Sequence, residues 1–243
     1  MKYFKENHLK ISLLGIGAVK IQLEQYSIYI DAVNNFNSLP KFKENDLLLF
    51  THGDEDHFSI DKFQPENINN LIIAPPNVIL ELYKSTKVQK DKLIDFLPHE
   101  YGKPLNYKID SVDISIFNTP HFIDWQNTHI SFLICAEGKK IFVTGDSRIQ
   151  AEDHKFISDV DCLIYSLLDF DIVKGRLDKR FGKYKHLIEI IELQRSLTPK
   201  KIIGNHLLNC DWAVNPGDIK ELLKKEKIDN VEIPTSDKDI IDL

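Results

Sequence analysis

One short segment of the sequence groups four side chains of the kinds that bind metal ions in proteins. His52, Asp54, Asp56 and His57 follow one another in the pattern His-x-Asp-x-Asp-His. Imidazole nitrogens and carboxylate oxygens ligate zinc at about 2.0–2.2 Å, and a tight turn can direct alternate members of such a run toward two different ions. The alternative is a solvated acidic turn in which Asp56 or Ser59 caps a helix. Two histidines that bracket two aspartates favour the metal site.

Three more candidate ligands stand alone, each at the end of a predicted strand. They are His121, Asp146 and His206. The four-residue segment itself follows residues 47–50, a continuous apolar run typical of a strand buried on both faces. Sites in layered α/β folds form at the carboxyl ends of strands, so the joint placement favours one shared site. Taken singly, the three residues could equally be a surface histidine, a helix cap and a packed core histidine.

The elements that must position these residues are short. Apolar runs and alternating patterns predict strands over residues 9–14, 19–23, 28–30, 47–50, 71–74, 111–119, 130–136, 139–144, 162–167, 201–204 and 231–233, the last of which completes the chain. Helices are predicted after Pro75-Pro76, over 184–197 and over 218–225. Two sheets with helices outside them account for this alternation, in an α/β fold.

Length and composition limit the function classes. The 243 residues contain no candidate linker, so we expect a single domain over residues 1–243. The formal net charge of −6 argues against broad nucleic-acid binding. The three cysteines, Cys135, Cys162 and Cys210, are far apart and predict neither a disulfide framework nor a thiolate zinc site. The sequence shows no secretory signal and no apolar run of about 20 residues, so we expect a cytoplasmic protein without a membrane span.

The order of the candidate ligands resembles that of the metallo-β-lactamase-fold hydrolases. The resemblance rests on the segment from His52 to His57, then His121, Gly145-Asp146 and His206. It runs nearly end to end, with residues 14–21 similar to the opening hairpin of that family and residues 28–31 similar to its strand that ends in Asp. Residues 71–76 and 143–146 look like the branch of ascorbate-6-phosphate lactonase-type proteins. The resemblance implies an αββα four-layer sandwich of the metallo-β-lactamase type.

The resemblance also implies two divalent metal ions, most often zinc. The first would be held by His52, residue 54 and His121, the second by Asp56, His57 and His206, and Asp146 would bridge the pair. The family usually has histidine where this chain has Asp54. A carboxylate is a harder ligand than imidazole, so Asp54 either shifts the preference toward manganese or iron or leaves the first site weak.

The implied activity is metal-dependent hydrolysis of an ester, lactone or phosphodiester bond in a small molecule, with anionic molecules among the candidates. Asp56 would orient the attacking water as well as ligate. Alternatives are a nuclease, which the net charge disfavours, and a di-iron redox or non-catalytic metal-binding protein, which Asp54 keeps open. A homo-oligomer is compatible with the sequence.

Several further residues are candidates for substrate contacts. His121 is favoured over His129 as a ligand because His129 lies at the start of a predicted strand, which leaves His129 to support a ligand or to contact substrate. His129 and Tyr165 are positional candidates for the general acid.

Phe122, Ile123 and Trp125 would either wall the pocket or simply pack within their loop. The basic segment 169–183 would form a lid over an anionic substrate, but a solvated loop is the favoured explanation because runs of charge usually face water.

Overall fold

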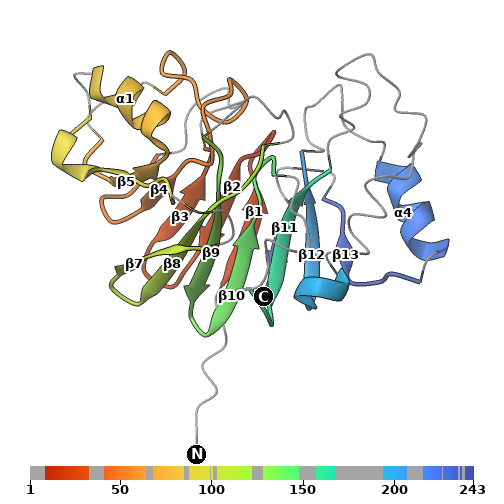
Figure 1. Cartoon of the computed structure of the whole chain (residues 1–243). Helices are drawn as coiled ribbons and strands as arrows, with labels where there is room; N and C mark the ends of the chain where they lie inside the picture. Colours follow the sequence, from red (N-terminus) through yellow and green to blue (C-terminus); the bar gives the residue numbers. More distant parts are fainter. Residues whose placement is uncertain are drawn as a thin grey trace, which may run out of the picture.

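Apolar runs of the sequence form two β-sheets of seven strands each in the computed structural model (Figure 1). The structure describes residues 9–32, 41–63, 68–84, 88–98, 100, 103–121, 128–147, 157–167, 194–206, 216–225, 227–234, 236 and 239–243. All statements below concern these residues.

The first sheet has the strand order β14-β1-β2-β3-β4-β5-β6. Its strands are β1 (Lys10–Leu13), β2 (Val19–Gln22), β3 (Ser27–Ile30), β4 (Leu47–Leu49), β5 (Leu71–Ala74), β6 (Leu93–Asp95) and β14 (Ile240–Asp242). Neighbours are antiparallel from β14 to β3 and parallel from β3 to β6.

The second sheet has the order β13-β12-β11-β10-β9-β8-β7. Its strands are β7 (Leu105–Ile109), β8 (Val112–Asn118), β9 (Ile130–Ala136), β10 (Lys139–Val143), β11 (Cys162–Ser166), β12 (Lys201–Asn205) and β13 (Val231–Glu232). It also changes from antiparallel to parallel pairing, at β10. The β9–β10 turn has φ 50° at Glu137 and 74° at Gly138, as a two-residue hairpin turn with two left-handed residues requires.

The main hydrophobic core lies between the sheets, and each sheet has a second apolar face. In β4, for example, Leu47 and Leu49 join the inter-sheet core while Leu48 packs in the cluster on the other face. The strand is therefore apolar at every position, which is the pattern that the sequence shows for a strand covered on both sides.

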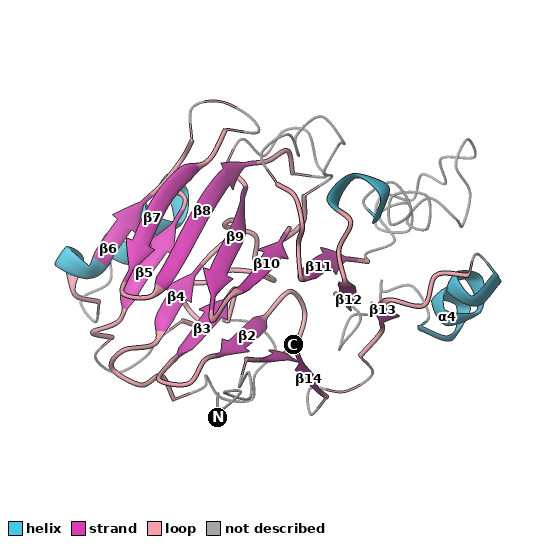
Figure 2. Ribbon diagram, turned by 90° about the horizontal axis from the view of Figure 1, so that it is seen from below, coloured by secondary structure: helices cyan, strands magenta, loops and turns pink. Residues whose placement is uncertain are grey.

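A helix packs on the outer apolar cluster of each sheet, and Figure 2 shows the one beside β13 at the end of the second sheet. Helix α1 (Pro76–Lys84) buries Val78, Ile79 and Leu82 against the first sheet. On the second sheet, α4 (Pro216–Lys225) contributes Leu223 to the outer cluster. A short 3₁₀ helix, η1 (Lys90–Lys92), precedes β6. The layers are helix, sheet, sheet and helix, so the predicted αββα sandwich is confirmed.

The sequence did not predict every element. The strand at residues 231–233 is not the last one, because β14 (Ile240–Asp242) follows it and pairs with β1. The signal for β14 is weak because Ile241 is its one buried residue. Strands β6 and β7 are also missing from the sequence-based prediction, since neither contains a fully buried residue. Of the predicted helix over 184–197, residues 194–197 are helical and the others lie outside the described residues.

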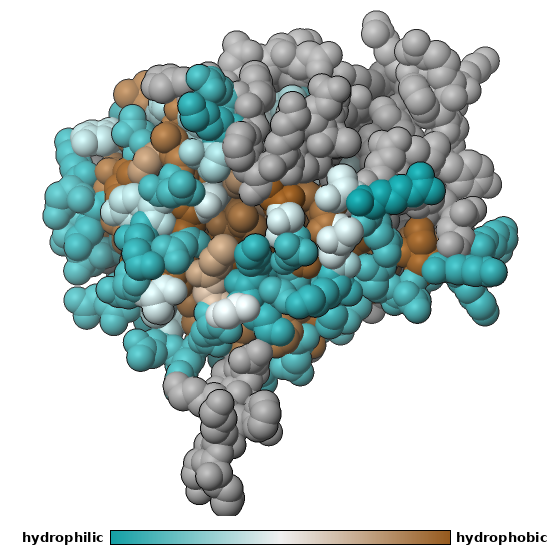
Figure 3. Space-filling model, turned by 60° about the horizontal axis from the view of Figure 1, so that its bottom comes forward, coloured by the Kyte–Doolittle hydropathy of each residue, from teal (hydrophilic) through white to brown (hydrophobic). Residues whose placement is uncertain are grey.

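The molecular surface is mostly hydrophilic on the face shown in Figure 3, with smaller hydrophobic areas between the polar side chains. Large exposed hydrophobic side chains among the described residues are Leu80 and Tyr83 on α1, Leu105 on β7 and Ile240 on β14. No described helix combines the length and apolar character needed to cross a membrane.

Asp161 joins the amino ends of three parallel strands in the second sheet. Its carboxylate accepts hydrogen bonds from the backbone N–H of Lys140, at 2.9 Å, and from the ammonium group of Lys200, at 2.7 Å. Burial by itself would raise the pKa of Asp161, but these two donors hold it below the ordinary value. The charged form of Asp161 therefore stabilises the folded chain.

We predict that Asp161→Asn lowers the free energy of unfolding by about 1–2 kcal/mol at pH 7, the low end for bonds to a charged group because Lys200 is exposed. A folded pKa below the unfolded value of about 4 gives stability that is present above pH 4 and lost as the pH falls through the folded pKa. Denaturant titrations should show the two proteins converging in acid. Asp113→Asn, which removes an exposed ion pair with Lys108, is the control and should change stability little. An equal deficit for Asp161→Asn at all pH values would contradict the prediction.

Candidate metal centre

The structure brings all seven predicted ligands together at the carboxyl ends of the strands. Four come from the loop after β4: His52, Asp54, Asp56 and His57. The other three follow separate strands of the second sheet, namely His121 after β8, Asp146 after β10 and His206 after β12. Both sheets therefore contribute to one cluster across the top of the inter-sheet core.

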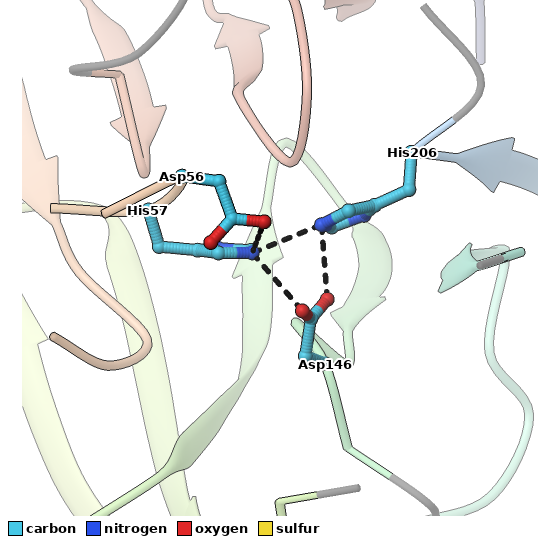
Figure 4. A group of neighbouring side chains, drawn as sticks. All are labelled: Asp56, His57, Asp146 and His206. Atoms are coloured by element: carbon cyan, nitrogen blue, oxygen red, sulfur yellow. Dashed lines mark hydrogen bonds and ion pairs between the residues drawn. The ribbon is translucent and has the colours of Figure 1, made fainter. Parts of the chain in front are cut away.

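One half of the cluster is formed by Asp56, His57, Asp146 and His206, whose ligand atoms all lie within 4.8 Å of one another (Figure 4). The Nε2 of His206 lies 2.9 Å from the Nε2 of His57 and 3.0 Å from Oδ1 of Asp146. The other Asp146 oxygen lies 3.3 Å from the Nε2 of His57. Two imidazole nitrogens and two carboxylates converge here on a volume the size of one ion.

The other half is formed by His52, His121 and the same Asp146, again with ligand atoms within 4.8 Å. Asp54 lies beside it, because its Oδ2 is 3.6 Å from the Nε2 of His52 and 3.5 Å from the Nε2 of His121. Asp54 thus points into the cluster rather than away from it. Asp146 belongs to both halves, which is the position that the sequence analysis predicted for a bridging ligand.

The tautomer of His57 is set by a residue that the sequence analysis did not single out as functional. Asp31, 1% exposed, lies directly after β3, and its Oδ2 is 2.7 Å from the Nδ1 of His57. A carboxylate can only accept, so the Nδ1 of His57 carries a hydrogen, and the ring would bind a cation through Nε2, which faces the cluster. A carboxylate behind a ligating imidazole is the usual arrangement in metal sites.

The same carboxylate fixes the tautomer of His52 through Thr51. The hydroxyl of Thr51 donates to Oδ2 of Asp31, at 2.7 Å, so its oxygen accepts from the Nδ1–H of His52, at 2.8 Å. The Nε2 of His52 is then unprotonated, is buried and has no hydrogen-bond partner in the described structure. A buried nitrogen lone pair that faces carboxylates fits a bound cation, so these residues suit the metal pair that the sequence predicts.

Asp31 could have been found from the strand order. It directly follows β3, the parallel neighbour of β4, and the carboxyl ends of parallel neighbours share one edge. Asp31 and His206 also take left-handed backbone conformations, with φ 51° and 64°. Such conformations are uncommon for residues other than glycine and concentrate at functional sites.

The electrostatics of the cluster keep its parts in different protonation states. Burial would lower the pKa of His57, but the carboxylates of Asp146, Asp31 and Asp56 raise it well above the ordinary value. Burial and the neighbouring His57 lower the pKa of His52 well below that value. For Asp146, burial opposes ionisation, but His206 and His57 lower the pKa well below the usual range. Asp146 is therefore a carboxylate at neutral pH.

The cluster is closed on its histidine side and open on the side of two carboxylates. The side chains of His57, His121 and His206 have no exposed surface, whereas Asp54 is 26% exposed and Asp56 is 32% exposed. Of the seven side chains of the cluster, Asp54 and Asp56 are therefore the ones that water reaches most easily.

Two alternative candidates from the sequence do not reach this opening. His129 is 1% exposed, and both ring nitrogens are hydrogen-bonded within the protein, so the structure favours His121 as the ligand. Tyr165 packs in the cluster on the outer face of the second sheet, which contradicts its role as general acid. The segments 122–125 and 169–183 lie outside the described residues.

Comparisons with known proteins agree with this fold. No family model matches the chain. A UPF0173 metal-dependent hydrolase of Bacillus velezensis is 24% identical over 166 residues, which are 63% of this chain and 69% of that protein.

Two solved structures illustrate the structural match. Igni18, a metallo hydrolase from the archaeon Ignicoccus hospitalis, superposes with a TM-score of 0.69 at 14% identity, covering 96% of this chain and 97% of that one. YhfI of Bacillus subtilis, a metallo-β-lactamase-fold protein, gives a TM-score of 0.67 at 16% identity, covering 97% and 99%. None of the three comparisons names the ascorbate-6-phosphate lactonase branch, which stays a prediction. The two mixed sheets, their helical layers and these superpositions show that the chain has the metallo-β-lactamase fold.

Proposed function

We propose that the protein is a metal-dependent hydrolase that binds two divalent cations in this cluster. The observation that carries the proposal is the pair of ligand groups that share Asp146, with His52 and His121 on one side and His57 and His206 on the other. The hydrolase of Bacillus velezensis supports it, since a relative of this chain carries that description.

Divalent cations bound here would supply a water with a pKa near 7 and would polarise the bond to be cleaved. The residues of this chain do the rest. Asp146 and the four histidines hold the cations from the closed side, while Asp56 at the opening orients the attacking water through its carboxylate. Asp56 is the proposed catalytic residue because it is both a member of the ligand group and the most exposed of the seven.

The two halves of the cluster have equivalent donors, and this bears on the choice of metal. Each half has two imidazoles, a carboxylate of its own and a share in Asp146. Zinc suits such a mixed set. A carboxylate at residue 54, in place of the histidine usual in the family, also suits manganese or iron, which accept harder ligands more readily.

That carboxylate also favours a second candidate function, a di-iron redox protein. Metal analysis of protein purified without added metal separates the two. Colourless protein with zinc or manganese supports hydrolysis, whereas two irons per chain with a visible absorption band support redox chemistry.

We propose a small molecule with an ester, lactone or phosphodiester bond as the substrate. The net charge of −6 argues against a long polyanion. A panel of lactones, thioesters and small phosphodiesters, assayed with and without a chelator beside RNA and DNA, tests this. Turnover of a small ester that the chelator abolishes supports the proposal; turnover of nucleic acid alone, or turnover that the chelator leaves unchanged, contradicts it.

The first mutational prediction for the metal site concerns His57. His57→Ala should reduce the bound metal from about two ions to about one per chain and lower turnover by more than about 100-fold, since even the loss of an outer partner of a ligand costs 10–100-fold. Circular dichroism should show a retained fold. Cys162→Ala, a buried truncation at the amino end of β11, is the control and should keep both ions. Full turnover by His57→Ala would rule out the proposed site.

The second prediction concerns the choice of metal at residue 54. Asp54→His should shift the occupied metal toward zinc and lower the manganese or iron content, because it replaces a hard ligand by imidazole. Elemental analysis of both proteins, grown in the same medium, measures the change. Asp113→Asn removes an exposed carboxylate on β8 and should leave the metal ratio unchanged. Identical ratios in Asp54→His and the original protein would show that Asp54 does not ligate.

The third prediction concerns Asp31. Asp31→Asn should weaken metal binding by about 10–100-fold, because an amide no longer enforces the Nδ1–H tautomers of His57 and His52. Asp46→Asn is a matched control: Asp46 is also 1% exposed, and it accepts backbone N–H groups of Ser27 and Lys43. Both variants should lose stability, but only Asp31→Asn should lose metal affinity in calorimetric titrations. Equal affinities in the two variants would remove Asp31 from the site.

A further inference from the structure

A chain of buried hydrogen bonds links the two ends of the turn that carries Asp146. The backbone N–H of Asp146 donates to the Nε2 of His129, at 3.0 Å. The Nδ1 of His129 lies 2.9 Å from the hydroxyl of Thr119, which lies 2.8 Å from the hydroxyl of Ser131. The Ser131 hydroxyl donates to the carbonyl of Thr144, at 2.8 Å. The chain thus starts two residues from where it ends, and all its side chains are buried.

The two backbone ends fix the direction of every bond in this chain. A carbonyl only accepts, so Ser131 spends its hydrogen on Thr144 and must accept from the Thr119 hydroxyl. Thr119 must then accept from the Nδ1–H of His129. At the other end an amide N–H only donates, so the Nε2 of His129 must be unprotonated. A neutral ring with its hydrogen on Nδ1 is the one state that satisfies both ends.

The turn between Thr144 and Asp146 is packed directly against this ring. Gly145 has φ 56°, and a Cβ at this position would lie 2.7 Å from the Nε2 of His129 and 2.9 Å from the Cβ of Thr51. The ring therefore holds the turn by contact as well as by the hydrogen bond to Asp146. Thr51 also belongs to the network that orients His52. The turn is therefore packed between His129, which bonds to Asp146, and Thr51, which bonds to His52.

We propose that His129 is a positioning residue that holds the Asp146 carboxylate between the two halves of the metal cluster and binds no metal itself. The inference rests on the proposed function, since it says that His129 fixes the position of Asp146, the ligand that the two cations would share. Its particular consequence is that loss of His129 weakens both ions together, whereas loss of a ligand such as His52 weakens mainly its own half.

The test compares two conservative variants. In His129→Gln the amide oxygen lies about as far along the side chain as the imidazole Nε2 and can accept from the Asp146 N–H. In His129→Asn the amide reaches only as far as Nδ1, so the bond to Thr119 can form but the bond to Asp146 cannot. Each variant removes one hydrogen bond of a buried polar residue, so a merely structural role predicts similar stability losses and unchanged metal affinity for both.

Calorimetric titration of the metal-free proteins with zinc and with manganese is the measurement. With either metal, we expect His129→Asn to bind both cations of the cluster about 10–100-fold more weakly, which is the range for residues that support a ligand. We expect the affinities of His129→Gln to stay within a few-fold of those of the original protein. Thermal unfolding checks that both variants fold. Equal affinities of the two variants, or a loss confined to one ion in His129→Asn, would overturn the proposal.

A second measurement does not depend on metal. Nitrogen NMR of the metal-free protein should show His129 as the neutral tautomer with hydrogen on Nδ1; a hydrogen on Nε2 would overturn the proposal. If the original protein binds no metal in the titration while NMR shows this tautomer, the proposed function fails, and the hydrogen-bond chain is left as a purely structural feature.

Discussion

The contact between the Nδ1 of His57 and the carboxylate of Asp31, at 2.7 Å, is the interaction on which the site depends. Four imidazoles and the carboxylate of Asp146 share one buried space, so each imidazole needs a hydrogen-bond partner that fixes which ring nitrogen carries its hydrogen. Asp31 fixes the ring hydrogen of two of these histidines, that of His57 directly and that of His52 through Thr51. It does so from the end of β3, the strand next to the one that carries the ligand loop, so one hydrogen-bond network joins two parallel strands of the first sheet.

The two sheets support the cluster in different ways. The first supplies four candidate ligands from a single loop, which its Asp31 and Thr51 organise. The second supplies three from three strand ends, and a rigid set of parallel and antiparallel neighbours fixes their spacing. Asp146 and His206 face His57 at 3.3 and 2.9 Å although they come from the other sheet. The inter-sheet core thus positions the site, because any sliding of the sheets would separate these groups.

Much of this could be predicted from the sequence because the decisive signals are local. The loop from His52 to His57 and the buried run of β4 are contiguous, and strand ends locate His121, Asp146 and His206 without knowledge of the sheet order. The position of Asp31 at a strand end is visible in the sequence, but its role and that of His129 depend on which ring nitrogen each hydrogen bond reaches, and no sequence pattern reports that. The edge strands β6, β7 and β14 were missed because edge positions bury few side chains and so leave little hydrophobic pattern. The periodicity of a sequence indicates which side chains are buried. The tautomer of a histidine and the pairing of an edge strand depend instead on contacts with residues that are distant in the sequence.

The uneven exposure of the ligands bears on how such a site could act. The histidines lie on the closed side, where Asp31 fixes a hydrogen on the Nδ1 of His57 directly and on the Nδ1 of His52 through Thr51, so that each Nε2 faces the cluster. Asp54 and Asp56 lie at the opening, where water can solvate their charge and exchange with substrate. In the proposed site, the groups whose geometry must not vary are thus buried and hydrogen-bonded, and the groups that would meet the reacting molecules are the hydrated ones. Preorganisation of this kind puts the cost of ordering charged ligands into folding, so that it is not incurred again when substrate binds.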